Sequence, residues 1–209
     1  MNEKKGSEQH GAEDIRTFIC IEIPESIKER IAQLQEMLRQ VDAQVSWTRP
    51  SNIHLTLRFL GGVPASRIER IGQAVERAAN CVRPFQVEVS GTGCFPSPRS
   101  PRVLWVGCSS VPEGLQELCA NIDNELARVG FARENQKFSP HLTIGRLRAS
   151  RNAGLLAEQL NMVGFEPENF EAQEIIVMRS NLKPAGSIYT PQATIKLDTG
   201  TLTKIKSYE

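Results

Sequence analysis

Two of the three histidines in this chain begin the same tripeptide, His-Leu-Thr. The first copy starts at His54 within the segment "NIHLTLRFLG", and the second starts at His141 within "SPHLTIGR". Both segments read as short β-strands, and in a strand residues i and i+2 point to the same face. Thr56 is therefore expected beside His54, and Thr143 beside His141, while the leucines between them face the core. Each strand would present one imidazole and one hydroxyl side by side.

This set of side chains is typical of acid–base cleavage of a phosphodiester, provided that the two strands face each other across a cleft. An unperturbed imidazole has a pKa of about 6.5, so both of its forms are present near neutral pH. One imidazole can deprotonate an attacking water or hydroxyl while the other protonates the leaving oxygen. The hydroxyls can donate to the non-bridging phosphate oxygens, where charge builds up in the transition state. A lone strand histidine is more often structural, but the repetition favours a catalytic pair.

The two triplets are poor metal sites. Neither contains a second histidine, a cysteine or a carboxylate that could complete a ligand set. The chain also lacks a Gly-rich phosphate-binding loop, so we expect neither a metal nor a cofactor. The third histidine, His10, lies in a polar N-terminal segment and is expected to take no part.

Two arginines are candidates for binding the substrate. Arg58 shares the face of His54 by strand alternation. Arg146 alternates to the face opposite His141, so it reaches the site only if the strand is twisted or bulged at Gly145. A guanidinium could hold a phosphate through two parallel hydrogen bonds. The alternative for Arg146 is a surface ion pair, and Arg58 is expected to add positive charge near the cleft.

The remaining aromatic and basic candidates have equally plain structural alternatives. Tyr189 could line the site or be a buried tyrosine with a satisfied hydroxyl. Phe59 is expected in the core rather than as a platform for a base. Arg99 and Arg102 lie in a Pro/Ser/Arg-rich segment, 95–102, which is predicted to be a solvated loop rather than a contact for RNA.

The elements around the two triplets predict an α+β fold. Apolar periodicity predicts further strands at 16–23, 85–91, 102–108, 174–180 and 187–197 and helices at 25–40, 112–129 and 152–160, with another beginning at Pro64. Strand pairs among the helices favour antiparallel sheets over a parallel one. Each half of the chain places a helix before and after its triplet, which indicates two similar lobes. No linker separates the halves, so one compact unit is expected.

Composition limits the classes of partner and compartment. The formal net charge of +1 argues against a large basic surface for nucleic acid, so a polyanion must meet local arginines. Five cysteines without a CxxC pair argue against a disulfide framework. No apolar run resembles a membrane span or a signal peptide. We expect a cytoplasmic protein with a disordered polar tail at 1–14, one domain at 15–198 and a C-terminal tail at 199–209.

The tandem motif resembles that of the two-histidine (2H) phosphoesterase superfamily. "RFLG" follows the first triplet and "GR" the second, and the opening "RTFICIEIP", the segment "PRVLWVG" and the closing "SIYTPQATIKL" are similar to the RNA 2′,3′-cyclic phosphodiesterases, also called 2′-5′ RNA ligases. The resemblance covers residues 16 to 197. One departure is Gly62, where a glutamate often follows "FLG".

The resemblance implies a bilobal fold with pseudo-two-fold symmetry, an active-site cleft between the lobes, and hydrolysis of RNA 2′,3′-cyclic phosphate ends to 2′-phosphates without metal. It implies that His54 protonates the departing 3′-oxygen, that His141 activates water, and that Thr56 and Thr143 bind the phosphate. The reverse reaction would form a 2′-5′ RNA linkage. Alternatives are a small cyclic nucleotide or 2′-5′ oligoadenylate as substrate, or a non-catalytic module that binds RNA ends. We expect a monomer.

Overall fold

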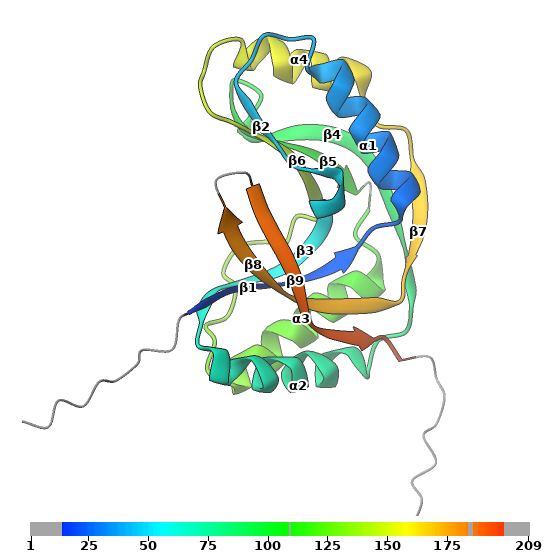
Figure 1. Cartoon of the computed structure of the whole chain (residues 1–209). Helices are drawn as coiled ribbons and strands as arrows, with labels where there is room; N and C mark the ends of the chain where they lie inside the picture. Colours follow the sequence, from blue (N-terminus) through cyan, green and yellow to red (C-terminus); the bar gives the residue numbers. More distant parts are fainter. Residues whose placement is uncertain (1–13, 109, 184–185, 199–209) are drawn as a thin grey trace, which may run out of the picture.

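The computed structural model describes residues 14–108, 110–183 and 186–198. The tails expected at 1–14 and 199–209, and with them His10, lie outside the described residues except for Asp14. The described part forms an α+β fold of two antiparallel sheets and four α-helices (Figure 1). Among its helices, none is both long and apolar enough to cross a membrane.

The strands form two separate sheets. In the first sheet the order is β3 (His54–Val63), β1 (Ile15–Glu22), β8 (Glu174–Lys183) and β9 (Gly186–Lys196). In the second the order is β2 (Val45–Trp47), β6 (His141–Leu147), β5 (Ser100–Cys108), β4 (Phe85–Ser97) and β7 (Glu168–Ala172). All the strand pairs in both sheets are antiparallel. The two His-Leu-Thr triplets thus lie in different sheets, on β3 and β6.

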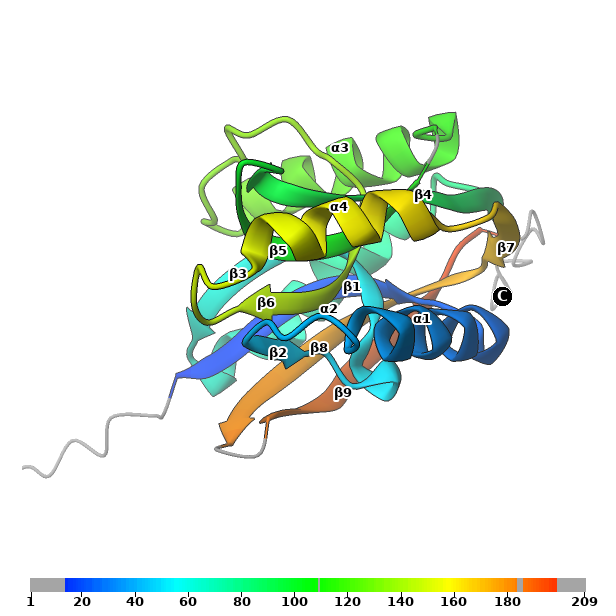
Figure 2. The same cartoon turned by 90° about the horizontal axis from the view of Figure 1, so that it is seen from above.

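The helices cover the outer faces of the two sheets. Below the first sheet lie α2 (Ile68–Ala79) and α3 (Glu113–Arg128), and above the second lie α1 (Glu25–Leu38) and α4 (Ala153–Val163) (Figure 1). Figure 2, the view from above, shows α4 lying over β4 and β5. Side chains at helical spacing make these contacts, and in α1 the buried set includes Ile27, Ile31, Leu34 and Leu38. The inner faces of the two sheets are left to face each other.

The two halves of the chain are interwoven and arranged with pseudo-two-fold symmetry. Each His-Leu-Thr strand pairs with the strand that precedes the first helix of its half, so β3 lies beside β1 and β6 beside β5. The next strand in each sheet comes from the opposite half, which places β8 beside β1 and β4 beside β5. Each sheet therefore contains strands from both halves of the chain. The predicted bilobal α+β fold is confirmed.

Two short strands and one hairpin differ from the sequence prediction. The strands β2 and β7 have only three and five residues, too few to show a clear alternation of apolar side chains. The segment 95–102, predicted to be a loop, is instead the tip of the hairpin formed by β4 and β5. Pro96 and Pro101 lie opposite each other there, at a shift in register, which is a position where a sheet tolerates proline.

Candidate active site

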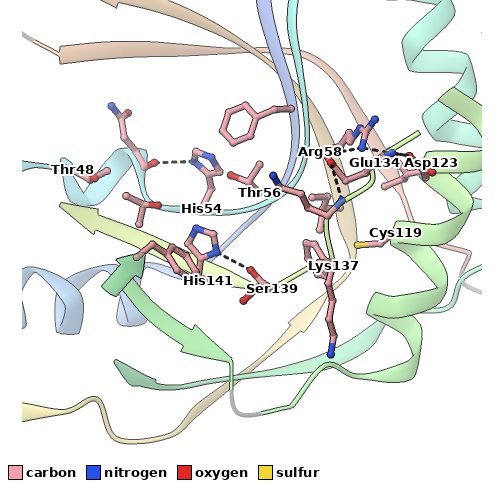
Figure 3. Close-up of a pocket in the computed structure, with 18 of the residues that line it drawn as sticks. Thr48, His54, Thr56, Arg58, Cys119, Asp123, Glu134, Lys137, Ser139 and His141 are labelled. Carbon is pink, nitrogen blue, oxygen red and sulfur yellow. Dashed lines mark hydrogen bonds and ion pairs between the residues drawn. The ribbon is translucent and has the colours of Figure 1, made fainter. Parts of the chain in front are cut away.

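The strands β3 and β6 lie in contact and bring the two triplets to one cleft between the lobes. The cleft has a volume of about 690 Å³, which is in the usual range for a ligand site. Figure 3 shows His54 and His141 pointing into the same space from opposite walls. The seven predicted site residues all line this cleft, namely His54, Thr56, Arg58, His141, Thr143, Arg146 and Tyr189.

Both histidines are oriented by the same local hydrogen bond. The Nδ1 atom of His54 lies 2.9 Å from the backbone oxygen of Asn52, and that of His141 lies 2.8 Å from the oxygen of Ser139. A carbonyl oxygen only accepts, so Nδ1 carries the proton in both rings. Nε2 is therefore left in each ring for a ligand in the cleft. The carbonyl always comes from the residue two positions before the histidine.

The hydroxyls of Thr56 and Thr143 are free for a ligand. Both threonines are half-buried and line the cleft beside their histidines. Within the described part of the chain neither hydroxyl makes a hydrogen bond. Two imidazoles and two available hydroxyls thus face one volume, as the predicted pairing requires.

A bulge in each triplet strand changes which side chains face the cleft after the threonine. The register of β3 on β1 shifts at Leu57, and that of β6 on β5 shifts at Ile144. As a result the fifth residue after each histidine, Phe59 or Arg146, lines the cleft. The irregularity that Arg146 needs is therefore present, beside Gly145. Phe59 is 58% exposed, so its prediction as a core residue is wrong.

The bulge on β6 is supported by the elements packed against it. A Cβ atom on Gly145 would lie 2.8 Å from Cγ1 of Val45 on β2, so only glycine allows this close approach. The side-chain amide of Gln35 on α1, 3% exposed, donates to the backbone oxygens of Thr48 and Ile144 at 2.8 Å each. These contacts hold the bulge and with it the position of Arg146.

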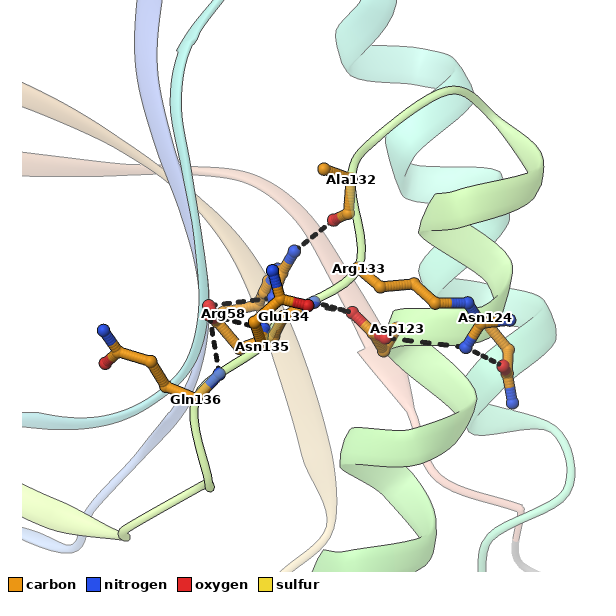
Figure 4. A network of polar contacts seen from close by, with 8 residues as sticks. All are labelled: Arg58, Asp123, Asn124, Ala132, Arg133, Glu134, Asn135 and Gln136. Atoms are coloured by element: carbon orange, nitrogen blue, oxygen red, sulfur yellow. Dashed lines mark hydrogen bonds and ion pairs between the residues drawn. The ribbon is translucent and has the colours of Figure 1, made fainter.

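The guanidinium of Arg58 is already paired with the protein. Its side chain is 11% exposed and lies 2.9 Å from a carboxylate oxygen of Glu134 and 3.5 Å from one of Asp123. It also donates to the backbone oxygen of Ala132 (Figure 4). Glu134 in turn accepts the backbone N–H groups of residues 135 and 136. Arg58 thus ties β3 to the loop 131–140, which leads into His141.

His54 is enclosed by two aromatic rings, whereas His141 contacts one ring within the described part of the chain. Phe18 stacks on His54 with ring centroids 4.6 Å apart, and Tyr189 meets it edge-on at 5.3 Å. Phe95 meets His141 edge-on at 4.9 Å. Burial lowers the pKa of His54 to about 4, although its hydrogen bond to the Asn52 carbonyl opposes this shift. His54 is therefore neutral at pH 7.

This lowered pKa predicts a dependence of stability on pH. Between pH 6.5 and pH 4 the imidazole of the unfolded chain, with a pKa of 6.5, is protonated while that of the folded chain is not. The free energy of unfolding therefore keeps its full value above pH 6.5 and decreases as the pH falls toward 4. At pH 5 the loss is about 2 kcal/mol, at about 1.4 kcal/mol per pKa unit. Urea unfolding at pH 7 and pH 5 should therefore show a smaller decrease for His54→Gln than for the wild type. Equal decreases in the two proteins would contradict this prediction, and His141→Gln is the matched control.

The sequence prediction missed several residues that shape the site. Asn52 and Ser139 act through backbone oxygens, which carry no signal in the side-chain pattern. Phe18 and Gln35 come from elements distant in sequence from the triplets. Of these residues, only Gln35 could have been noticed in the sequence, because it is a polar residue within the apolar stripe of α1. Thr48 and Lys137 also line the cleft.

No group of three or more His, Cys, Asp or Glu side chains suited to a metal ion occurs in residues 14–108, 110–183 and 186–198. Arg99 and Arg102 are exposed on the β4–β5 hairpin and do not line the cleft.

Comparison with known proteins places this geometry in a family. The LigT like phosphoesterase family model matches residues 21–105 and again residues 106–189, so each match contains one His-Leu-Thr triplet. A protein of Methanothermobacter thermautotrophicus named RNA 2′,3′-cyclic phosphodiesterase is 34% identical over 88% of this chain and 99% of its own length. One of the same name from Thermotoga maritima is 33% identical over 84% of this chain and 91% of its own.

Solved structures share the fold. TT0787 of Thermus thermophilus superposes with a TM-score of 0.73 at 24% identity, over 88% of this chain and 98% of that one. E. coli LigT complexed with 3′-AMP gives a TM-score of 0.70 at 25% identity over the same shares of the two chains. The two family matches together span most of the described residues, and both contain the histidine, threonine and bulge described above. The chain therefore belongs to the LigT-like phosphoesterase family of two-histidine enzymes.

Proposed function

We propose that this protein hydrolyses the 2′,3′-cyclic phosphate at the end of an RNA strand to a 2′-phosphate. The observation that carries the proposal is the paired site itself, in which each imidazole turns Nε2 toward the cleft beside an available threonine hydroxyl. The relatives named RNA 2′,3′-cyclic phosphodiesterase support this choice of substrate. A non-catalytic module for RNA ends would need no such acid–base pair.

In the proposed mechanism the two histidines have opposite tasks. His141 accepts a proton from the attacking water, and His54 protonates the departing 3′-oxygen. The hydroxyls of Thr56 and Thr143 donate to the non-bridging oxygens as their charge grows. Arg146 contributes a positive charge beside the cleft, because it makes no ion pair within the described part of the chain. The same steps with a 5′-hydroxyl in place of water would form a 2′-5′ linkage, with the 3′-oxygen again as the leaving group.

The low pKa of His54 constrains its role as the acid. A neutral imidazole must first gain the proton that it delivers, and a phosphodiester anion bound beside it raises its pKa again. The protonated ring, placed against the aromatic wall of Phe18 and Tyr189, can then deliver its proton to the departing 3′-oxygen. The proposal thus ties protonation of His54 to the arrival of the substrate.

Product analysis tests the proposed reaction directly. RNA that ends in a 2′,3′-cyclic phosphate is incubated with the protein, and the product is digested and separated to distinguish 2′- from 3′-phosphates. A 2′-phosphate product means that the 3′-oxygen leaves, as proposed. A 3′-phosphate product, or no hydrolysis, would overturn the proposal.

For Arg58 we propose positioning rather than contact with the substrate. Its charge is matched by Asp123 and Glu134, and the loop that it holds ends at the Ser139 carbonyl that orients His141. Arg58→Ala and Glu134→Gln should each lower kcat by about 10-fold, because small misplacement of a catalytic group is costly. Arg58→Lys should restore part of the rate.

The Glu134→Gln variant distinguishes between positioning of the loop by Arg58 and binding of a phosphate by Arg58. If Arg58 instead bound a phosphate, Glu134→Gln would release its guanidinium for the substrate and lower KM. In the positioning role, both variants shift the ¹⁵N resonances of the His141 ring, since Nδ1 loses its fixed partner. An unchanged His141 spectrum in both variants would reject positioning.

We further propose that the protein acts as a monomer in the cytoplasm. Both histidines and both threonines of the cleft come from one chain. The five cysteines are all free, as is usual in a reducing compartment. Sedimentation at working concentration tests the oligomeric state.

A further inference from the structure

The chain crosses from the second sheet to the first through residues 48–52, the crossover segment. This segment follows β2, which pairs with β6, and it leads into β3, which begins at His54. It contains the short 3₁₀ helix η1 (Pro50–Asn52), against which α1 packs (Figure 2). The backbone oxygen of Asn52 accepts the Nδ1–H of His54. The position of the crossover segment therefore sets the position of the first imidazole.

A buried amide holds the start of the crossover segment. The side chain of Gln35 belongs to the buried stripe of α1, with Leu34 and Leu38, and Gln35 is 3% exposed. Its Nε2 atom lies 2.8 Å from the backbone oxygen of Thr48 and 2.8 Å from that of Ile144. Because carbonyl oxygens only accept, the amide donates both of its hydrogens to them. An apolar side chain would fill the same stripe, so the particular contribution of the amide is this pair of hydrogen bonds.

The two carbonyls that Gln35 binds belong to different parts of the site. The Thr48 carbonyl starts the crossover segment, and the Ile144 carbonyl lies at the bulge of β6. The backbone nitrogen of Thr48 also donates to the Ile144 oxygen at 3.0 Å. Gln35 thus fastens the segment that leads to His54 to the strand that begins with His141. Because the amide is buried, loss of either bond leaves an unpaired polar group, which is costly.

The rest of the crossover segment is stiff enough to pass this position on. A backbone hydrogen bond closes η1, with the nitrogen of Asn52 2.8 Å from the oxygen of Arg49, and the ring of Pro50 restricts the backbone between them. At the far end, the side-chain amide of Asn52 donates to the backbone oxygen of Ser187 on β9 at 2.8 Å. The segment is therefore held at both ends, by Gln35 at the start and by β9 at the end.

We propose that Gln35 is a positioning residue for His54, which it holds opposite His141 by fixing the crossover segment on β6. It corresponds to the proposed role of Arg58 in the other half of the chain. Each side chain holds a segment that ends at the carbonyl two residues before one of the histidines, Asn52 in one case and Ser139 in the other. The effect on catalysis rests on the proposed phosphodiesterase activity, whereas the effect on the His54 ring does not.

The ring resonances of the two histidines test the positioning directly. Gln35→Met removes both donors and keeps an unbranched apolar side chain that suits the helix. The ¹⁵N resonances of His54 should shift, because Nδ1 loses its fixed partner, and those of His141 should stay. Arg58→Ala should give the reverse pattern. Gln33→Met, on the exposed face of α1, is the matched control and should move neither ring. An unchanged His54 ring, or equal shifts in both rings, in Gln35→Met would overturn the proposal.

Kinetics show whether Gln35 acts through His54. Gln35→Met should lower kcat on cyclic-phosphate-ended RNA by about 10-fold, because small misplacement of a catalytic group is costly, with little change in KM. Added to His54→Ala it should cost nothing further, since both changes remove the same function. On a phosphodiester that releases 4-nitrophenolate, which needs no acid, it should be close to the wild type. A further 10-fold loss in the double variant, or equal losses on both substrates, would assign Gln35 to the bulge and Arg146 instead and reject the proposal.

A second variant acts on the crossover segment from its other end. Asn52→Ala removes the bond to Ser187 and keeps the carbonyl that orients His54, so it should shift the His54 ring and lower kcat with the same substrate pattern. This variant decides the proposal if circular dichroism shows that Gln35→Met does not fold, and an unchanged His54 ring in it would then overturn the proposal. A shifted His54 ring in a protein whose wild type does not hydrolyse the RNA would reject the proposed function and leave the positioning role intact.

Discussion

Replacing either histidine of the pair is expected to lower kcat/KM on cyclic-phosphate-ended RNA by at least about 10²-fold, the usual contribution of a general acid or base. His54→Ala removes the proposed acid and His141→Ala the proposed base. The double variant should lose little more than the more damaging single one, because the two groups act in the same step. His10→Ala is the matched control, since it removes the third histidine. The kcat/KM of the two single variants, the double variant and the control is measured by steady-state hydrolysis and compared with that of the wild type.

A substrate with a good leaving group separates the two roles. An acyclic phosphodiester that releases 4-nitrophenolate needs no proton on its leaving oxygen, so His54→Ala should regain much of its rate on this substrate. His141→Ala should remain slow, because water still has to be deprotonated. Rescue of His141→Ala alone would reverse the assignments. Full activity of both variants on RNA would rule out the two-histidine mechanism.

The second large effect is expected from the two threonines. Thr56→Val and Thr143→Val keep the shape of the side chain and remove only the hydroxyl, so each should lower kcat by about 10²-fold, comparable to loss of one oxyanion donor. Thr56→Ser and Thr143→Ser should retain most of the activity because they keep a donor. Thr194→Val, on the exposed edge of β9, is the matched control.

The kinetic pattern shows where the hydroxyls act. Donors that strengthen only as charge builds up lower kcat and kcat/KM equally when they are removed. A rise in KM with an unchanged kcat would mean that the threonines merely bind the ground-state phosphate. If both valine variants had the kcat and KM of the wild type, the hydroxyls of Thr56 and Thr143 would have no part in the mechanism.

Local patterns in the sequence were enough to locate the chemical groups. The alternation of imidazole, leucine and hydroxyl is a property of a single strand, so it predicted that Thr56 shares a face with His54 and Thr143 with His141. The same alternation indicated that Arg146 needs an irregularity at Gly145, and the structure contains one beside it, at Ile144. The α+β class followed from the apolar periodicity of helices such as α1. Very short strands such as β2 have too few residues for this argument.

What the sequence by itself determined is therefore which side chains share a face of each triplet strand, because strand alternation and residue type are local. Only the tertiary structure decided how they are used, since this depends on contacts between distant segments. It paired Arg58 with Glu134, turned Phe59 out of the core through a bulge, and enclosed His54 between Phe18 and Tyr189. The two triplets are identical in sequence, but burial lowers the pKa of His54 to about 4. The asymmetry needed for an acid and a base therefore arises from packing.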